Sequence, residues 1–102
     1  MDGGRPEPFI DDGGLLRFDD RWVALTEAQL PVVALLIAHL GSVVRNEELL
    51  AAYEAGGGTG TPAALRPLIH RLRQRVGAVG LVLHVVRRRG VLLEPSTADE
   101  PR

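Results

Sequence analysis

Seven arginines lie between residues 55 and 93, and this stretch of the chain contains no acidic residue. Residues 1–54 carry four arginines and ten acidic residues, a net charge of −6, whereas residues 55–93 have a net charge of +7. All twelve basic residues are arginines, whose planar guanidinium groups donate two parallel hydrogen bonds to a phosphate or a guanine edge. A segment this positive predicts a surface that binds a polyanion; the alternative is an arginine-rich surface exposed only to solvent.

Residues suited to other chemistry are missing from the sequence or poorly placed in it. The chain has no cysteine, which excludes disulfides and thiolate zinc sites. The serines, Ser42 and Ser96, fall in turn-like and terminal sequence, where no nucleophile is expected. The histidines, His39, His70 and His84, lack the spacing of metal ligands. The sequence therefore predicts no catalytic site, no metal site and no cofactor.

The length of 102 residues, with 45% hydrophobic and 25% charged residues, is typical of one globular domain. We expect this domain to span residues 9–94, between a flexible N-terminus at 1–8 and a flexible C-terminal tail at 95–102. The longest apolar run, Leu30 to Ala38, is about half of the ~20 residues that a membrane-spanning helix needs, and no signal sequence opens the chain. The sequence predicts a cytoplasmic protein without a membrane partner.

Short apolar runs near the N-terminus predict antiparallel strands. Leu15–Phe18 and Trp22–Leu25 flank Asp19-Asp20, a spacing that favours a hairpin. Phe9-Ile10 adds an edge strand in front of it. We interpret Asp11-Asp12, like Asp19-Asp20, as a turn rather than an acidic site.

A first helix is predicted from Thr26 to a stop at Gly41. Thr26 and Gln29 have the spacing of a capping box, in which two side chains satisfy backbone N–H groups reciprocally. Pro31 should loosen the first turn without abolishing it. The apolar residues expected on the core face are Leu30, Val33, Ile37 and Leu40.

A second, shorter helix is predicted from Arg45 or Asn46 to about Tyr53, with two glutamates near the positive end of its dipole. Residues 56–61 follow as a glycine-rich stretch without the lysine of a phosphate-binding loop. We expect this stretch to be a flexible connector.

A third helix is predicted over residues 62–76, and it carries most of the positive charge. Its core face consists of apolar residues spaced by four, three and four positions: Leu65, Ile69, Leu72 and Val76. Polar or basic residues point away from this face or flank it: Arg66, His70, Arg71, Arg73, Gln74 and Arg75. Pro67 removes one backbone donor, so we expect a kink or a helix that effectively begins there.

The C-terminal part predicts a second β-hairpin. Leu81–Val86 and Val91–Leu93 are apolar and flank three consecutive arginines, Arg87, Arg88 and Arg89. Gly90 is expected to supply a positive φ in the turn. The clustered charges at the hairpin tip indicate a phosphate backbone or a narrow minor groove as their partner.

Strands, three helices and a basic hairpin, in this order, resemble an α+β winged helix-turn-helix. The stretch ALTEAQLPVVALLIAHLGSVVRNEELLAAY resembles the first two helices of the OmpR/PhoB-type DNA-binding domain. ALRPLIHRLRQRVG and VVRRRGVLLE resemble its recognition helix and its wing. The resemblance covers about Leu15 to Glu94, and the wing looks like that of a subgroup found after uroporphyrinogen-III synthase-like modules.

The resemblance implies specific roles in DNA binding. Arg71 and Arg73 match arginines that meet DNA in the major groove, with His70 beside them, and Arg87 matches a wing contact next to Arg88 and Arg89. Residues 54–61 match a loop through which activators of this family touch RNA polymerase. A regulatory domain is the other usual protein partner, and the family often forms head-to-tail dimers on DNA, although no dimer surface is evident in this sequence.

These observations predict a bacterial transcription regulator that binds double-stranded DNA and is not an enzyme. The third helix would lie in the major groove and the wing at residues 87–90 near the minor groove. The alternative is a winged-helix module that binds another protein, because Pro67 and the apolar Leu68 interrupt the expected recognition surface.

Overall fold

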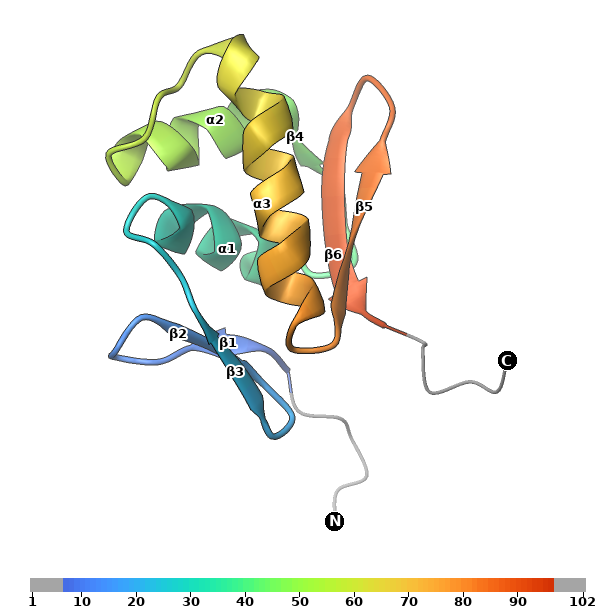
Figure 1. The fold of residues 1–102 in the computed structure, drawn as a ribbon. Coiled ribbons are helices and arrows are strands. Elements are labelled where there is room, and N and C mark those ends of the chain that lie inside the picture. The colour runs from blue at the N-terminus through green and yellow to red at the C-terminus, as the bar shows by residue number, and fades with distance from the viewer. Residues whose placement is uncertain (1–6, 97–102) are drawn as a thin grey trace.

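The computed structural model describes residues 7–96, which fold into two small antiparallel sheets and three helices (Figure 1). The first sheet contains β1 (Phe9–Ile10), β2 (Leu15–Phe18) and β3 (Arg21–Ala24) in that order. The helices are α1 (Gln29–Ala38), α2 (Asn46–Ala55) and α3 (Leu65–Gly77), with a 3₁₀ turn, η1 (Pro62–Ala64), directly before α3. The second sheet has the order β4-β6-β5, with β4 (Val44–Arg45), β5 (Leu81–Val86) and β6 (Gly90–Pro95). This is the α+β winged helix-turn-helix order predicted from the sequence.

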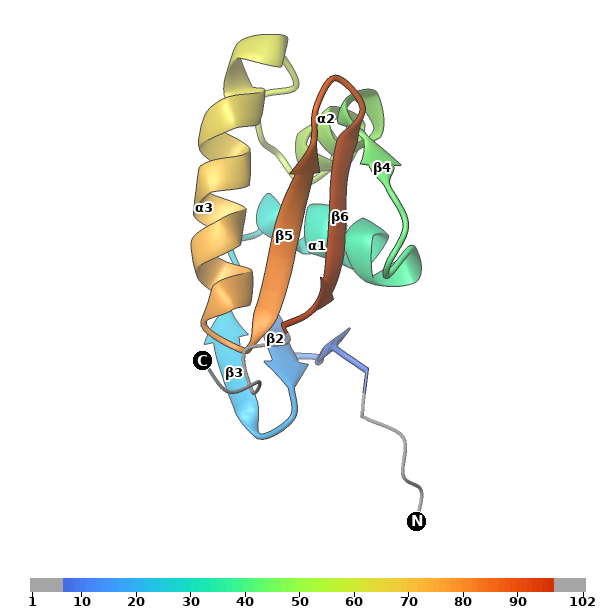
Figure 2. The same ribbon diagram turned by 90° about the vertical axis from the view of Figure 1, so that its right-hand side faces the viewer.

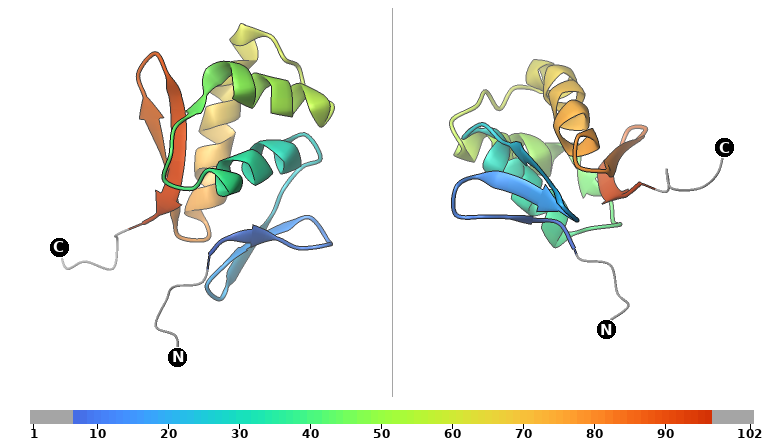
Figure 3. Two further views of the ribbon diagram at one scale, coloured as in Figure 1. Left: turned by 180° about the vertical axis from the view of Figure 1, so that it is seen from behind. Right: turned by 60° about the horizontal axis from the view of Figure 1, so that its bottom comes forward.

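The ribbon views show how α3 is placed between the other elements. In Figure 1, α3 lies in front of α1 and α2, with the β5–β6 hairpin along one side and the first sheet near its C-terminal end. Figure 2 shows β5 and β6 running alongside α3, and Figure 3 shows α1 and α2 covering its inner side. None of the helices in the described part of the chain is long and apolar enough to span a membrane.

The predicted element boundaries shift at several positions. β3 begins one residue earlier than expected and β6 extends to Pro95, which pairs with Leu81. The predicted flexible ends otherwise lie almost entirely outside the described residues. The strand β4 was not predicted, because two residues are too short to show an alternating pattern; Val44 of this strand pairs with Val91 of β6.

The predicted capping box forms at the start of α1. The Thr26 backbone N–H donates to Gln29 Oε1 at 2.9 Å, and the Gln29 N–H donates to Thr26 Oγ1 at 3.2 Å. Regular α-helix begins at Gln29, and Pro31 lies in its first turn, where backbone N–H groups have no intrahelical partner. The fully buried apolar residues are Val32, Val33 and Leu36, whereas the predicted Leu30, Ile37 and Leu40 are only half-buried. The helix is apolar on almost every side, so spacing alone does not identify its innermost face.

Several glycines of the stretch after α2 lie close to neighbouring residues, a packing that the expected flexible connector did not include. A Cβ on Gly58 would lie 2.5 Å from the Tyr53 ring, and a Cβ on Gly56 would lie 2.8 Å from the Glu27 carbonyl oxygen. The Gly58 N–H also donates to the Tyr53 carbonyl at 2.9 Å. Gly56 and Gly58 therefore leave no room for a side chain, whereas Gly57 instead has a positive φ of 99°.

Gly90 has a different role from the one predicted. The residue with positive φ in the wing turn is Arg88, at 66°, and Gly90 is not among the glycines with positive φ in the described chain. A Cβ on Gly90 would instead lie 1.9 Å from the Val44 carbonyl oxygen and 2.8 Å from Arg45 Cα. The close approach of β6 to β4 therefore excludes any side chain at position 90.

Asp11 holds the turn between β1 and β2. Its Oδ1 accepts hydrogen bonds from the backbone N–H groups of Gly13 and Leu15, both at 2.9 Å. Its Oδ2 accepts a hydrogen bond from Arg17 Nε at 2.6 Å. The Arg17 side chain, followed by the backbone donors, holds the pKa of Asp11 below its ordinary value of 3.8. The predicted turn at Asp11-Asp12 is thus held by an ion pair and two backbone hydrogen bonds.

We expect Gly90→Ala to lower the free energy of unfolding by about 3 kcal/mol, because the new methyl group would force β6 away from the β4 backbone. Chemical denaturation measures this change. The matched control is Gly77→Ala at the end of α3, where no atom lies within 4 Å of the added Cβ. Equal losses in the two variants would contradict the importance of the β4–β6 contact.

We expect Asp11→Asn to weaken the fold at neutral pH and to have progressively less effect in acid. A lowered pKa means that ionised Asp11 stabilises the fold above pH 3.8 and that this contribution is lost as the pH falls below that value. Urea unfolding of parent and variant across this range measures the difference. Asp11→Ala, which also removes the acceptor of the Gly13 and Leu15 N–H groups, should be less stable than the Asn variant at every pH. A constant difference between parent and Asn variant would argue against the stabilising role of the ion pair.

Candidate nucleic-acid interface

The buried side of α3 determines which residues it exposes. Leu68, Leu72 and Val76 are 2%, 0% and 0% exposed, whereas the predicted core residues Leu65 and Ile69 are only half-buried. The inner face is therefore rotated toward Leu68, because α3 packs against α2 as well as β5. Leu68 cannot form part of an exposed protein-binding surface, which removes one support for that alternative.

Pro67 is compatible with a continuous helix. It is the third residue of α3, and the first residues of an α-helix have N–H groups without intrahelical acceptors. The 3₁₀ turn η1 precedes it and joins α3 without an intervening loop. The expectation that regular helix begins near Pro67 is correct to within two residues.

The predicted site residues of α3 all reach its outer side or its edges. His70, Arg71 and Gln74 are exposed, as are Arg66 and Arg73, and Arg75 is half-buried. We call these six residues the α3 surface. Within residues 7–96, none of its arginines forms an ion pair with an acidic side chain, so their positive charge is not neutralised by the protein.

Two arginines of the α3 surface are hydrogen-bonded to neighbouring strands. Arg73 Nε donates to the Leu83 carbonyl of β5 at 3.3 Å, and Arg75 Nη1 donates to the Ala24 carbonyl of β3 at 2.6 Å. Each guanidinium has five N–H donors, so these bonds orient the group while leaving other donors available. The two residues thus brace α3 against both sheets while keeping positive charge at its edges.

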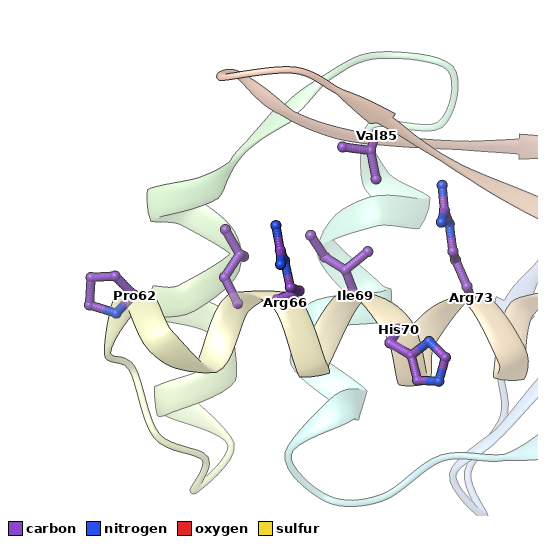
Figure 4. Close-up of a pocket in the computed structure, with 7 residues that line it drawn as sticks. Pro62, Arg66, Ile69, His70, Arg73 and Val85 are labelled. Atoms are coloured by element: carbon purple, nitrogen blue, oxygen red, sulfur yellow. The ribbon is translucent and has the colours of Figure 1, made fainter.

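An open groove of about 490 Å³ separates α3 from β5. Figure 4 shows Arg66, Ile69 and Arg73 extending from the helix toward Val85, while His70 lies on the outward side of the helix. The groove is lined by apolar residues together with two arginines and a histidine, and no acidic residue lines it within the described chain. Val85, which is 49% exposed, was missed as a site residue. The alternation of β5 could have identified it, since Val85 shares a strand face with Leu81 and Leu83.

The wing turn brings together the other three predicted residues. Arg87, Arg88 and Arg89 are all exposed, and we call them the wing tip. The Arg89 N–H donates to the Val86 carbonyl at 2.9 Å and closes the turn. Arg88 adopts the left-handed conformation that favours glycine, which is an unusual position for a long side chain. The fold thus holds three positive charges together at an exposed tip.

Three residues of the α3 surface, Arg66, His70 and Arg73, line the groove beside β5. The other three line a second hollow toward α1 and α2, and no wing-tip residue lines either one. In the part of the chain that the structure describes, no cluster of three or more potential metal ligands exists. The arrangement offers planar donors along a helix about as wide as a DNA major groove, together with charge on a protruding hairpin. Its chemistry suits a polyanion with grooves.

The chain has the fold of solved C-terminal DNA-binding domains of OmpR/PhoB-family response regulators. It is similar to the C-terminal domain of the nisin resistance regulator NsrR, with a TM-score of 0.71 and 26% identity over 91% of this chain and 96% of that one. It also resembles the AdeR DNA-binding domain in complex with an intercistronic region, with a TM-score of 0.69 and 18% identity over 88% and 96% of the two chains.

A third similar structure is the Klebsiella pneumoniae RstA DNA-binding domain in complex with the RstA box. Its TM-score is 0.62, with 23% identity over 90% of this chain and 95% of that chain. No protein-family model and no curated protein sequence matches the chain. The fold that the sequence resemblance implied is confirmed by these structural neighbours.

We expect Arg88→Gly to raise the free energy of unfolding by about 1 kcal/mol, because glycine adopts positive φ without steric cost. The matched control is Arg87→Gly, which removes the same charge at a residue without positive φ in this structure and should lower stability by about 0.5–1 kcal/mol. Thermal and chemical denaturation of both variants measure the difference. Changes of the same sign and size would show that charge, not backbone conformation, dominates the turn.

Proposed function

We propose that this domain binds double-stranded DNA as the DNA-reading part of a bacterial transcription regulator. In this proposal α3 lies in the major groove, and the wing tip lies near the adjacent minor groove. Residues 9–94 form the binding domain, which acts by binding rather than by catalysis and does so in the cytoplasm, where bacterial DNA is found.

The observation that carries the proposal is the uncompensated positive charge of the α3 surface and wing tip. Together they present seven arginines from two elements, with no acidic partner among residues 7–96. Supporting this proposal, the structural neighbours AdeR and RstA were solved with DNA bound to domains of the same fold. The burial of Leu68 argues against the alternative of a protein-binding surface centred on Pro67 and Leu68.

The positions of the side chains suggest different tasks within the interface. Arg71 is exposed on the outer side of α3, where its guanidinium group can donate two hydrogen bonds to a guanine. Arg66, Arg73 and Arg75 lie at the edges of the helix, where phosphates would pass, and contribute affinity at every sequence. The wing tip adds charge near the minor groove.

We expect Arg71→Ala to weaken binding to a preferred site by about 1–3 kcal/mol and to reduce discrimination between sequences. Fluorescence anisotropy with a random duplex pool and with genomic fragments, at two salt concentrations, measures both effects. Replacing all three wing-tip arginines with alanine should instead weaken binding to every duplex. The slope of log K against log salt should then become shallower by about 0.9 for each phosphate that the variant no longer neutralises.

The matched control is Arg21→Ala, which removes the same charge from β3 in the first sheet. It should bind like the parent protein apart from a small long-range electrostatic effect. Parent-like binding by both the Arg71 variant and the wing-tip variant would disprove this assignment of the DNA-binding face. No binding by the parent even at low salt would disprove the function itself.

A further inference from the structure

His70 is the one histidine of the α3 surface, and histidine is the residue type that ordinarily changes charge between about pH 5 and 8. It is exposed on the outward side of α3, beside the groove (Figure 4). Arg66 lies four residues before it and Arg73 three residues after it, so both are its neighbours on the helix surface. The other groove-lining side chains, from η1, α3 and β5, are apolar.

Within the described chain, nothing acidic lines the groove beside His70, and none of its ion pairs involves this residue. Arg66 and Arg73 are the charged groups that face the groove from its own helix, and β5 contributes only the uncharged Val85. A positive imidazolium at this position would therefore need negative charge from outside the protein. A DNA duplex bound to the α3 surface supplies that charge, and a nearby anion favours the protonated form of histidine.

The other two histidines lie in different surroundings. His84 Nε2 is 2.7 Å from Glu94 Oε2, so His84 already has an acidic partner in the protein. His84 also precedes Val85 on β5, and alternation along a strand turns it to the face opposite the groove. His39 follows the last residue of α1. The chain thus carries one histidine on the proposed DNA-binding face and two natural controls away from it.

We infer that DNA binding by this domain is coupled to the uptake of a proton by His70, so that acidification tightens the complex. The inference rests on the proposed function and adds a form of regulation to the same site. The protonated ring donates a hydrogen bond to an acceptor of the duplex, which is either a phosphate oxygen or a purine base edge. No covalent step is involved, and the proton comes from solvent.

The test is a series of anisotropy titrations with the full chain at constant ionic strength. We expect the dissociation constant of the parent protein to fall roughly tenfold between about pH 8 and about pH 5.5, the range in which histidine changes charge. His70→Gln should show little change in affinity over this pH range, whatever its affinity at high pH. His70→Arg, with a permanent charge, should bind tightly throughout the range. Circular dichroism at each pH checks that all variants remain folded.

His39→Gln and His84→Gln are the matched controls and should keep the pH dependence of the parent protein. Comparing a preferred genomic fragment with a random pool separates the two acceptors. A proton-linked effect on both duplexes indicates a phosphate, and an effect on the preferred fragment alone indicates a base edge; either result supports the inference.

Binding by the parent that does not change with pH would overturn the inference while leaving the proposed function intact. Retention of the full pH dependence by His70→Gln would also overturn it. Absence of DNA binding at every pH would instead overturn the proposed function, and the inference with it.

Discussion

The packing of three side chains on the inner side of α3 governs the rest of the structure. Leu68, Leu72 and Val76 are almost completely buried, and burial of each apolar side chain of this size stabilises the fold by about 1.5–3 kcal/mol. Because these residues recur every four positions, they fix the rotation of the helix about its axis. With this rotation fixed, the basic residues lie on the outer side of the helix and at its edges. The free energy gained by burying the inner side chains therefore offsets the repulsion among the positive charges on the outer side.

The placement of the wing depends on a second constraint, the close approach of β6 to β4 at Gly90. The Val44 and Arg45 backbone occupies the space that a side chain at position 90 would need. Since β4 runs directly into α2, this contact fixes the end of the hairpin next to the wing turn relative to α2. The wing tip can therefore present its charges at a defined position beside α3, although the turn itself contains a strained residue, Arg88.

Local patterns in the sequence predicted the elements that depend on local interactions. The capping box at Thr26, the two hairpins and the segregation of charge into residues 55–93 are all legible in short windows. Features that depend on residues far apart in the sequence were not predicted. The strand β4 exists only because β6 pairs with it, the burial of Leu68 depends on packing between helices, and the steric role of Gly90 depends on Val44. The groove beside Val85 likewise needs both α3 and β5 in place.

The hydrogen bond from Arg75 to the Ala24 carbonyl joins residues 51 positions apart in the chain. It ties the last turn of α3 to the final residue of β3, and α3 also packs against β3. This bond closes a long loop of backbone, so the first sheet is joined to α3 by a side chain as well as by packing.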